Sequence, residues 1–307
     1  MTQASKSDRN NKLQDMMLKK SAKRRVINKL ATIFAITAVI LAIVPLGSIL
    51  VEVIRNGISA INIDFLTQPP GAVGTGGGGI APAIEGTLIL IGLASLIGVP
   101  IGVLAGIYLS EFAGSGMFPS AVRFFNDVLS GLPSIVLGIV GYILLVLTIG
   151  SFSVWAGAFA LSLIMIPIIV RVTEETLKIV PDSIREAGHS LGIPKRKVTL
   201  YIVLKTAKSG VLTGIVLAIS RIAGETAPLI LTILGTSLFF TSLTGPVDAL
   251  PLRIWRLASQ PYESAHAFGW GAAFILIVII LVLSVSLRLL AQRKGFRIRT
   301  TVALTGG

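Results

Sequence analysis

Residues 174–232 read EETLKIVPDSIREAGHSLGIPKRKVTLYIVLKTAKSGVLTGIVLAISRIAGETAPLILT, and this stretch decides the class of fold. Its first half is polar and basic. Residues 211–232 are apolar and long enough to cross a bilayer, which needs about 20 apolar residues. The apolar half nevertheless contains Arg221 and Glu225, two charges that are costly inside a membrane. The stretch therefore predicts a surface loop joined to a membrane span whose charged residues have a function.

The composition of the whole chain indicates an integral membrane protein. Of its 307 residues, 53% are hydrophobic and 13% are charged, and the mean hydropathy is +0.86. A soluble domain carries about 25% charged residues. The chain has no Cys, and His189 and His266 lie far apart in the sequence, so we expect neither a disulfide framework nor a metal site. Aromatic residues are sparse in the basic runs, which argues against nucleic-acid binding despite the net charge of +13.

Six apolar runs are long enough to span a bilayer. The first follows a basic N-terminal tail, is too long for the apolar region of a cleaved signal peptide and lacks an A-x-A site after it, so we expect it to be retained. The predicted fold class is an all-α membrane protein with six transmembrane helices. The predicted spans are Ile27–Val53, Gly86–Leu109, Val128–Ile149, Val154–Val172, Val211–Leu234 and Phe268–Leu290.

The distribution of Lys and Arg over the connections predicts the orientation in the membrane. Residues 1–29, the loop after the second span, the segment 171–209 and the residues from Arg288 onward contain nine, one, eight and five of these residues. The connections on the other side contain one, none and two. Because cytoplasmic loops are enriched in Lys and Arg, both termini and the segment 171–209 are predicted to be cytoplasmic. The predicted regions are a basic tail (1–26), a first transmembrane helix (27–53), a transmembrane core (82–291) with a cytoplasmic coupling loop (173–209), and a C-terminal tail (292–307).

Glycine and proline recur in the second and third predicted spans. Small residues let transmembrane helices pack closely, so close packing is the expected role of most of the glycines. Hinges are expected at Pro100 and Pro133, since proline kinks are tolerated in membrane helices. The glycines are Gly92, Gly98, Gly102, Gly106, Gly131, Gly138 and Gly141.

The cytoplasmic loop is predicted to present a short helix between two breaks. Pro181 suits the first turn of a helix, Gly192 suits its C-terminal end, and Pro194 prevents continuation. A second, basic helix, KRKVTLYIVLKTAKS, then leads into the membrane.

Two roles remain open for the short helix. It can lie on the lipid head groups, but such a helix prefers bulky apolar residues on its buried face. Leu177, Ile184 and Leu191 share one face at helical spacing, yet the helix is otherwise poor in bulky apolar residues. Its small residues favour contact with a protein. They are Ala187, Gly188, Ser190 and Gly192.

The charged span places Arg221 and Glu225 four residues apart, on one face of a continuous helix. An Arg at mid-membrane costs about 2.5–3.5 kcal/mol, so it is expected to face the interior of a bundle or water. The order Arg before Glu is the less favourable one within a helix. A buried ion pair that fixes the helix register and a path for an anion both fit. Arg171, at the cytoplasmic end of the fourth span, is either part of the exit of that path or an anchor at the head groups.

The coupling loop resembles the EAA loop of type I ABC importer permeases. Residues 186–192 read EAGHSLG and residues 202–205 read IVLK, similar to E-A-A/G-x-x-x-G followed by I-x-L-P, with Lys205 where the family usually has Pro. The resemblance implies the MetI-like permease fold, with a coupling helix that sits in a groove of a separate ATPase subunit. The residues implied in this coupling are Glu186, Ala187, Gly188, Ser190, Leu191 and Gly192.

The charged span resembles the signature of one family of these permeases. Residues 221–228 read RIAGETAP, similar to R-x-x-G-E-T-A-P of the PstA family of phosphate-importer permeases, whereas the sister PstC family usually reads G-E-T-M. The resemblance extends over most of the chain after residue 25. Further similar stretches are GGIAPAIEGT (78–87), GIYLSEF (106–112), SGLPSIVLG (130–138) and ALPLRIW (249–255).

This resemblance implies a permease subunit that moves inorganic phosphate into the cytoplasm through the plasma (inner) membrane of a bacterium or archaeon. The implied partners are a homologous PstC-like permease, a dimer of PstB-like ATPase subunits and an extracytoplasmic PstS-like phosphate-binding protein. ATP and Mg²⁺ are bound by the ATPase, so this chain is expected to be no enzyme and to hold no cofactor or metal; it contains no G-x-x-x-x-G-K-[ST] loop. The residues expected along the phosphate path are Arg221, Glu225, Thr226 and Arg171.

Two other functions remain open. One is a permease for another oxyanion, such as molybdate or sulfate, against which the GETAP signature argues. The other is an autonomous channel or secondary carrier, which would have no need of an ATPase-docking helix.

Overall fold

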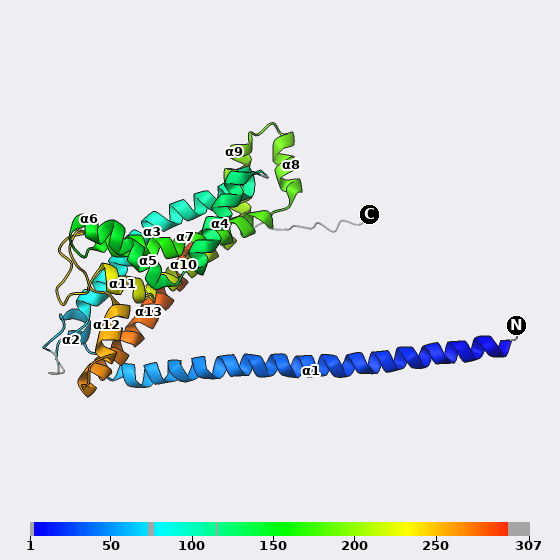
Figure 1. Cartoon of the computed structure of the whole chain (residues 1–307), viewed down its shortest axis with the longest axis horizontal. Helices are drawn as coiled ribbons and strands as arrows, with labels where there is room; N and C mark the ends of the chain where they lie inside the picture. The colour runs from blue at the N-terminus through cyan, green and yellow to red at the C-terminus, as the bar shows by residue number, and fades with distance from the viewer. Residues whose placement is uncertain (1–2, 73–76, 115, 294–307) are drawn as a thin grey trace, which may run out of the picture. The chain divides into compact units, whose positions relative to one another are not determined.

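The computed structural model describes residues 3–72, 77–114 and 116–293 (Figure 1). Over these ranges the chain is helical, and its extended residues pair only in two isolated bridges, Pro70 with Gly78 and Leu234 with Val247. Residues 1–2 and 294–307 of the predicted tails lie outside the described residues. Five helices are long and apolar enough to cross a membrane, or six if one bent pair counts as a span.

The chain divides into two units, Met1–Arg55 and Asn56–Gly307. The first unit consists of helix α1 (Gln3–Ile58), whose last residues belong to the second. Its segment Ile27–Ile58 reaches a mean hydropathy of 2.6, as expected of a membrane span. The backbone is already helical from Gln3, so the basic tail continues into the span without a break.

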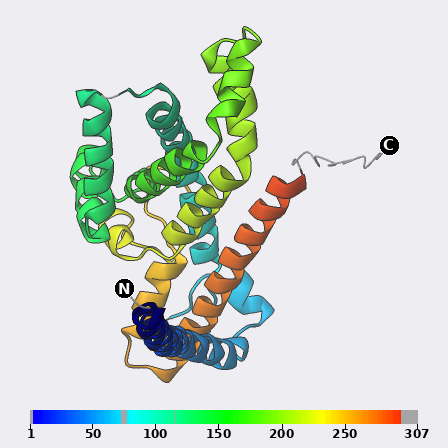
Figure 2. The same cartoon turned by 90° about the vertical axis from the view of Figure 1, so that its right-hand side faces the viewer.

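The second unit contains the other helices. Figures 1 and 2 show α8 and α9 standing together beyond the ends of the long helices. We call this side the α8 end, and the side that carries the segment 234–258 the α12 end. The elements are α2 (Ile63–Thr67), α3 (Ala81–Ile107) with a π-helical turn η1 (Tyr108–Phe112), α4 (Met117–Gly131), α5 (Ser134–Gly141), the π-helical turn η2 (Tyr142–Val146), α6 (Leu147–Ile149), α7 (Val154–Lys178), α8 (Asp182–Ser190), α9 (Lys195–Val198), the π-helical turn η3 (Thr199–Val203), α10 (Leu204–Ala223), α11 (Ala227–Thr232), α12 (Leu250–Ala258) and α13 (Glu263–Arg293).

Helix α7 forms the centre of the second unit, and α3 packs along it through glycines spaced four residues apart. A Cβ at Gly102 would lie 2.7 Å from the Cβ of Ile169, and one at Gly106 would lie 2.6 Å from the Cβ of Thr173. Gly98 meets α7 in the same way, at Met165. Small residues bring two membrane helices into close contact. The predicted packing role of these three glycines is confirmed.

The other predicted glycines divide into two groups. A Cβ at Gly138 would lie 2.6 Å from the Cα of Pro228, and Gly141 faces α7 closely as well. Gly92 and Gly131 have open space where a Cβ would be. Five of the seven glycines thus pack closely, which confirms the prediction made for most of them, and Gly92 and Gly131 are the exceptions.

The third predicted span is not one straight helix. It breaks at Leu132 and Pro133, and the axes of Met117–Gly131 and Ser134–Ile149 differ by 106°. Proline disfavours helical backbone in the residue before it and lacks an N–H donor, and Leu132 is extended, with φ −72° and ψ 139°. The expected hinge at Pro133 coincides with this break, whereas α3 continues through Pro100.

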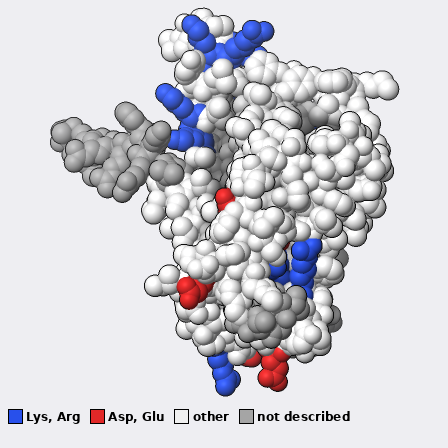
Figure 3. Space-filling view, turned by 90° about the vertical axis from the view of Figure 1, so that its left-hand side faces the viewer, with Lys and Arg blue, Asp and Glu red and all other residues white. Residues whose placement is uncertain are grey.

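At the α12 end, the segment that precedes α12 is fastened to the start of α3. Thr87 Oγ1 accepts a hydrogen bond from the N–H of Leu250 at 2.8 Å, and Glu85 Oε2 accepts one from the N–H of Phe240 at 3.1 Å. In Figure 3, charged side chains gather near the two ends of the face shown, and the surface between them is almost entirely uncharged, as expected of a protein surrounded by lipid.

Candidate functional site

The charged span is broken at the point where its charges lie. Helix α10 ends at Ala223, and α11 begins at Ala227 with Pro228 in its first turn. Gly224 has low helix propensity, and proline cannot donate the next backbone hydrogen bond. The prediction of a continuous helix over Val211–Leu234 is therefore wrong, and Glu225 lies in the break.

Arg221 and Glu225 nevertheless form the pair that their spacing suggested. Arg221 Nε lies 3.1 Å from Glu225 Oε1. The Glu225 side chain is 12% exposed, whereas that of Arg221 is 58% exposed. The carboxylate thus lies inside this chain, and the guanidinium lies at its surface, where another subunit or water has to solvate it if the span is in a membrane.

A small cavity lies beside Arg221 at the break between α4 and α5. Its volume is about 120 Å³, and Ser130 and Ser134 are polar residues of its lining. Ser130 Oγ donates to the carbonyl of Asn126, whereas Ser134 Oγ has no hydrogen bond within the described part of the chain. The sequence did not single out these serines; the motif SGLPS with its proline was the available signal.

Thr226 follows Glu225 directly and is half-buried at the start of α11. Its carbonyl accepts hydrogen bonds from the N–H groups of Leu229 and Ile230, at 3.1 and 3.2 Å. The break in the span therefore contains Glu225 and Thr226, and Arg221 lies in the last turn of α10 just before it.

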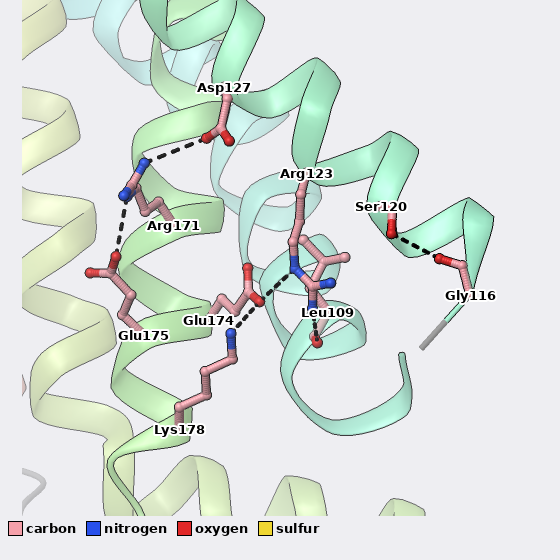
Figure 4. A network of polar contacts seen from close by, with 9 residues as sticks. All are labelled: Leu109, Gly116, Ser120, Arg123, Asp127, Arg171, Glu174, Glu175 and Lys178. Carbon is pink, nitrogen blue, oxygen red and sulfur yellow. Dashed lines mark hydrogen bonds and ion pairs between the residues drawn. The ribbon is translucent and has the colours of Figure 1, made fainter. Parts of the chain in front are cut away.

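Arg171 belongs to a different group of residues, on α7 near the α8 end (Figure 4). Its Nε lies 3.1 Å from Glu175 Oε1, and its Nη1 lies 3.4 Å from Asp127 Oδ1 on α4. The Arg171 side chain is 63% exposed. Arg171 is thus paired, and it is open to solvent or to a partner.

A more buried network lies next to this group. Glu174 Oε1 accepts hydrogen bonds from Arg123 Nε at 3.0 Å and from Lys178 Nζ at 2.6 Å, and Arg123 Nη2 donates to the carbonyl of Leu109 at 3.1 Å (Figure 4). The Glu174 side chain is 11% exposed. A cavity of about 210 Å³ is lined by residues of both groups, from α4 and α7. The spacing of Glu174 and Lys178 indicates a pair from the sequence alone. Arg123 lies 51 residues away from Glu174, so its part in the network could not be predicted from spacing.

The predicted short helix is present as α8. It begins after Pro181, Gly192 follows it with a φ of +72°, and Pro194 precedes α9. Its predicted limits are confirmed. Where the family usually has Pro, Lys205 lies inside a helical run that continues from α9 through η3 into α10.

The apolar face predicted for this helix is not a single face. Leu177 is fully buried in α7, before the break at Pro181, and Leu191 is 78% exposed beyond the end of α8. Only Ile184 of the three lies on α8, where it is half-buried. The spacing rule failed because the chain turns between Leu177 and Ile184.

The small residues of the coupling helix also have two different roles. Gly188 is buried, and a Cβ there would lie 2.9 Å from Val198 Cγ2, so it lets α8 pack against α9. The prediction that Gly188 forms part of an exposed patch is therefore wrong. The other residues predicted for coupling are exposed: Glu186, Ala187, Ser190, Leu191 and Gly192.

Arg185, which precedes Glu186, points inward. Its side chain is 18% exposed and pairs with Glu111, of which 4% is exposed, at 2.7 Å. The hydrogen bond to the Glu111 carboxylate raises the pKa of Arg185 above its ordinary value, although burial opposes this. The sequence reasoning did not identify this pair, because 74 residues separate its members.

Comparison with known proteins gives a consistent result. The family described as "Binding-protein-dependent transport system inner membrane component" matches residues 98–296. The phosphate transport system permease protein PstA of Yersinia pestis is 39% identical over 282 residues, which cover 92% of this chain and 96% of that protein. A probable phosphate transport system permease protein PstA of Methanocaldococcus jannaschii is 38% identical over 266 residues, covering 86% and 94%.

Solved structures show the same fold at low sequence identity. A chain of a bacterial alginate ABC transporter, in complex with an alginate pentasaccharide-bound periplasmic protein, aligns with a TM-score of 0.64 at 15% identity, covering 86% of this chain and 94% of that chain. A chain of the MetNI methionine ABC transporter, in an inward-facing conformation, aligns with a TM-score of 0.54 at 15% identity, covering 70% and 93%. The predicted fold class, an all-α membrane protein of the ABC importer permease type, is confirmed.

Proposed function

The chain belongs to the binding-protein-dependent transport system inner membrane components and, among them, to the PstA permeases, and we propose that it carries inorganic phosphate into the cytoplasm. The observation that carries this proposal is the 39% identity to a phosphate permease over 92% of the chain. The chain is a multi-pass subunit of the plasma (inner) membrane of a bacterium or archaeon, with both termini in the cytoplasm. The excess of Lys and Arg in alternate connections supports this orientation.

Three partners complete the transporter. A dimer of PstB-like ATPase subunits binds ATP and Mg²⁺ and docks on the α8 end, and this chain itself hydrolyses nothing. The exposed Glu186, Ala187 and Leu191 support this docking, since residues of the EAA-like loop have to lie at the surface to contact an ATPase. A PstS-like phosphate-binding protein delivers its ligand at the α12 end. A homologous PstC-like permease covers the exposed guanidinium of Arg221.

Arg221 and Glu225 form the selective part of the path. Phosphate at neutral pH retains a proton, and sulfate does not. Glu225, as a carboxylate, accepts a hydrogen bond from the P–OH group and repels an oxyanion that has no proton to donate. Arg221 offsets the charge of the phosphate, and Thr226 follows Glu225 in the break between α10 and α11. Arg171, exposed at the α8 end, attracts the anion as it leaves.

The test is phosphate and sulfate uptake by the four-component complex in liposomes, with ATP supplied to the ATPase side. We expect Arg221→Gln to lower phosphate uptake roughly 10- to 100-fold, the cost of losing one charged hydrogen bond. We expect Glu225→Gln to lower the preference for phosphate over sulfate. Arg288→Gln, at an exposed basic residue near the end of α13, serves as the control and keeps native uptake.

Three results would contradict the proposal. Unchanged phosphate uptake in both Arg221→Gln and Glu225→Gln would exclude these residues from the path. Preferred uptake of molybdate or sulfate by the native complex would show that the substrate is another oxyanion. Uptake that needs neither ATP nor a co-purifying ATPase would indicate an autonomous carrier.

A further inference from the structure

The π-helical turn η1, at the end of α3, is held by two residues of the coupling loop. Arg185 of α8 donates from Nη2 to Glu111 Oε1 at 2.7 Å and from Nε to Glu111 Oε2 at 3.2 Å, so both carboxylate oxygens are bound. The Nζ of Lys195, at the start of α9, lies 5.3 Å from the ring centre of Phe112. Bidentate Arg–carboxylate pairs are strong and fix the orientation of both groups. The end of α3 is therefore joined to the loop by defined contacts.

The same guanidinium also binds the end of α7. Its Nη2 donates to the carbonyl of Leu177 at 2.8 Å, and its Nη1 donates to the carbonyl of Val180 at 2.5 Å. The Leu177 carbonyl also accepts from the N–H of Val180 at 3.2 Å, so the arginine reinforces the turn that follows α7. Arg185 thus connects α3, α7 and α8 through one planar group.

The pair of Arg185 and Glu111 is largely enclosed by the protein. Arg185 is 18% exposed and Glu111 is 4% exposed, whereas the other acid paired with Arg185, Asp182, is 88% exposed. Behind the pair, Ile107 of α3 belongs to one buried apolar cluster with Leu177 and Val180. A group enclosed in this way moves only together with its surroundings.

Helix α3 is also fastened at its other end. Together with η1 it covers Ala81–Phe112, a length of about 48 Å at 1.5 Å per residue. At the α12 end, Glu85 and Thr87 accept the hydrogen bonds from the segment that precedes α12. One continuous helix therefore links the loop that carries the exposed coupling residues to the opposite end of the unit.

We propose that Arg185 is a positioning residue for energy coupling: through Glu111 it transmits the displacement of the ATPase-facing helix α8 to α3. This inference rests on the proposed function, because it needs an ATPase docked on α8. The exposed face of α8 takes up the motion of the ATPase, and the inward-pointing Arg185 passes it to α3 and α7. An arginine that served only to fold the loop would leave the ratio of transport to ATP hydrolysis unchanged when altered.

The experiment uses the four-component complex in liposomes, with the native chain and with Glu111→Gln and Arg185→Lys. Glu111→Gln removes the charge and keeps the shape, while Arg185 retains its two carbonyl partners. A lysine at 185 keeps the charge, but one ammonium lacks the planar fork that reaches the carboxylate and both carbonyls. Asp182→Asn is the matched control, since it removes only the exposed partner of the same guanidinium.

The readouts are the amount of co-purifying ATPase, the rate of ATP hydrolysis with the phosphate-loaded binding protein, and the phosphate moved per ATP. We expect both variants to retain the ATPase and to move about tenfold less phosphate per ATP hydrolysed, a typical coupling effect. Asp182→Asn is expected to keep the native ratio.

Two results would overturn the inference while the native complex still transports phosphate. A native ratio in Glu111→Gln would show that the pair transmits nothing. Loss of the ATPase from both variants would show that the pair only shapes the docking surface. If the Glu111→Gln chain does not accumulate in the membrane, the same readouts on Arg185→Lys test the inference. A native complex that moves no phosphate would instead contradict the proposed function itself.

Discussion

Two of the arginine–glutamate pairs in the second unit differ in how they are enclosed, one at the α8 end and one at the break between α10 and α11. Arg185 and Glu111 are both largely buried, come from different helices and satisfy each other at two oxygens. Arg221 and Glu225 are four residues apart, and 58% of the Arg221 side chain is exposed. The first pair is complete within the chain, whereas the second leaves its cation open to another subunit or to an anion. Burial, more than the presence of a pair, therefore separates an internal connection from a site that can bind something else.

A third pair, Asp248 with Arg253 at the α12 end, is more completely buried than either of these. Its loss is expected to reduce the stability most. The Asp248 side chain is 0% exposed, and Arg253 Nε lies 2.6 Å from its Oδ2. We expect Arg253→Met to lower the free energy of unfolding by about 3–5 kcal/mol, because it leaves a buried carboxylate unpaired. The measurement is the thermal unfolding midpoint of the purified complex in detergent. The double variant with Asp248→Asn is the control and regains much of the loss; an equal loss in both would contradict the explanation.

Loss of the pair between Arg185 and Glu111 is expected to reduce the stability by the next largest amount. Replacing Arg185 with Met removes the partner of buried Glu111 and of two carbonyls, so we expect a loss of about 3 kcal/mol, the lower end of the range for a broken buried pair. Thermal unfolding measures this loss, with Asp182→Asn as the exposed control. A midpoint that does not move would show that the pair is solvated, and the contrast with Arg221 would then disappear.

Packing beneath α8 is expected to have a smaller effect. Gly188→Val places a side chain against Val198, and we expect this overpacking to cost about 1–3 kcal/mol. Because the clash moves α8 away from α9, less ATPase should co-purify with this variant. Ala187→Val, at an exposed position of the same helix, is the matched substitution for stability. If Gly188→Val matches Ala187→Val in unfolding midpoint, Gly188 does not set the contact between α8 and α9.

The smallest expected effect on stability belongs to Arg221. The Arg221 side chain is 58% exposed, so water screens its charge, and glutamine keeps a donor for the largely enclosed Glu225. We therefore expect Arg221→Gln to lower the free energy of unfolding by only about 1 kcal/mol, measured from the unfolding midpoint of the isolated chain. The same substitution is expected to lower phosphate uptake in the complex. A large loss of stability would identify Arg221 and Glu225 as a structural pair, and the difference between the two regions would then be one of position only.

Some parts of the candidate site followed from local sequence. Pro181, Gly192 and Pro194 set the limits of α8, because glycine and proline restrict the backbone wherever they occur. The pairing of Arg221 with Glu225 followed from their spacing. The break after Ala223 does not follow from apolar composition, which predicts one span; Gly224 and Pro228 are the local signal for it.

Apolar length and short motifs are local properties, so they were enough to predict an all-α membrane protein of the ABC importer permease type. Which charges are enclosed depends on the packing of the folded chain. Glu111 and Arg185 are 74 residues apart, and neither spacing nor composition connects them. Whether a side chain is solvated depends on what the rest of the chain packs around it. For that reason the structure, rather than the sequence, separates the enclosed Arg185 from the open Arg221.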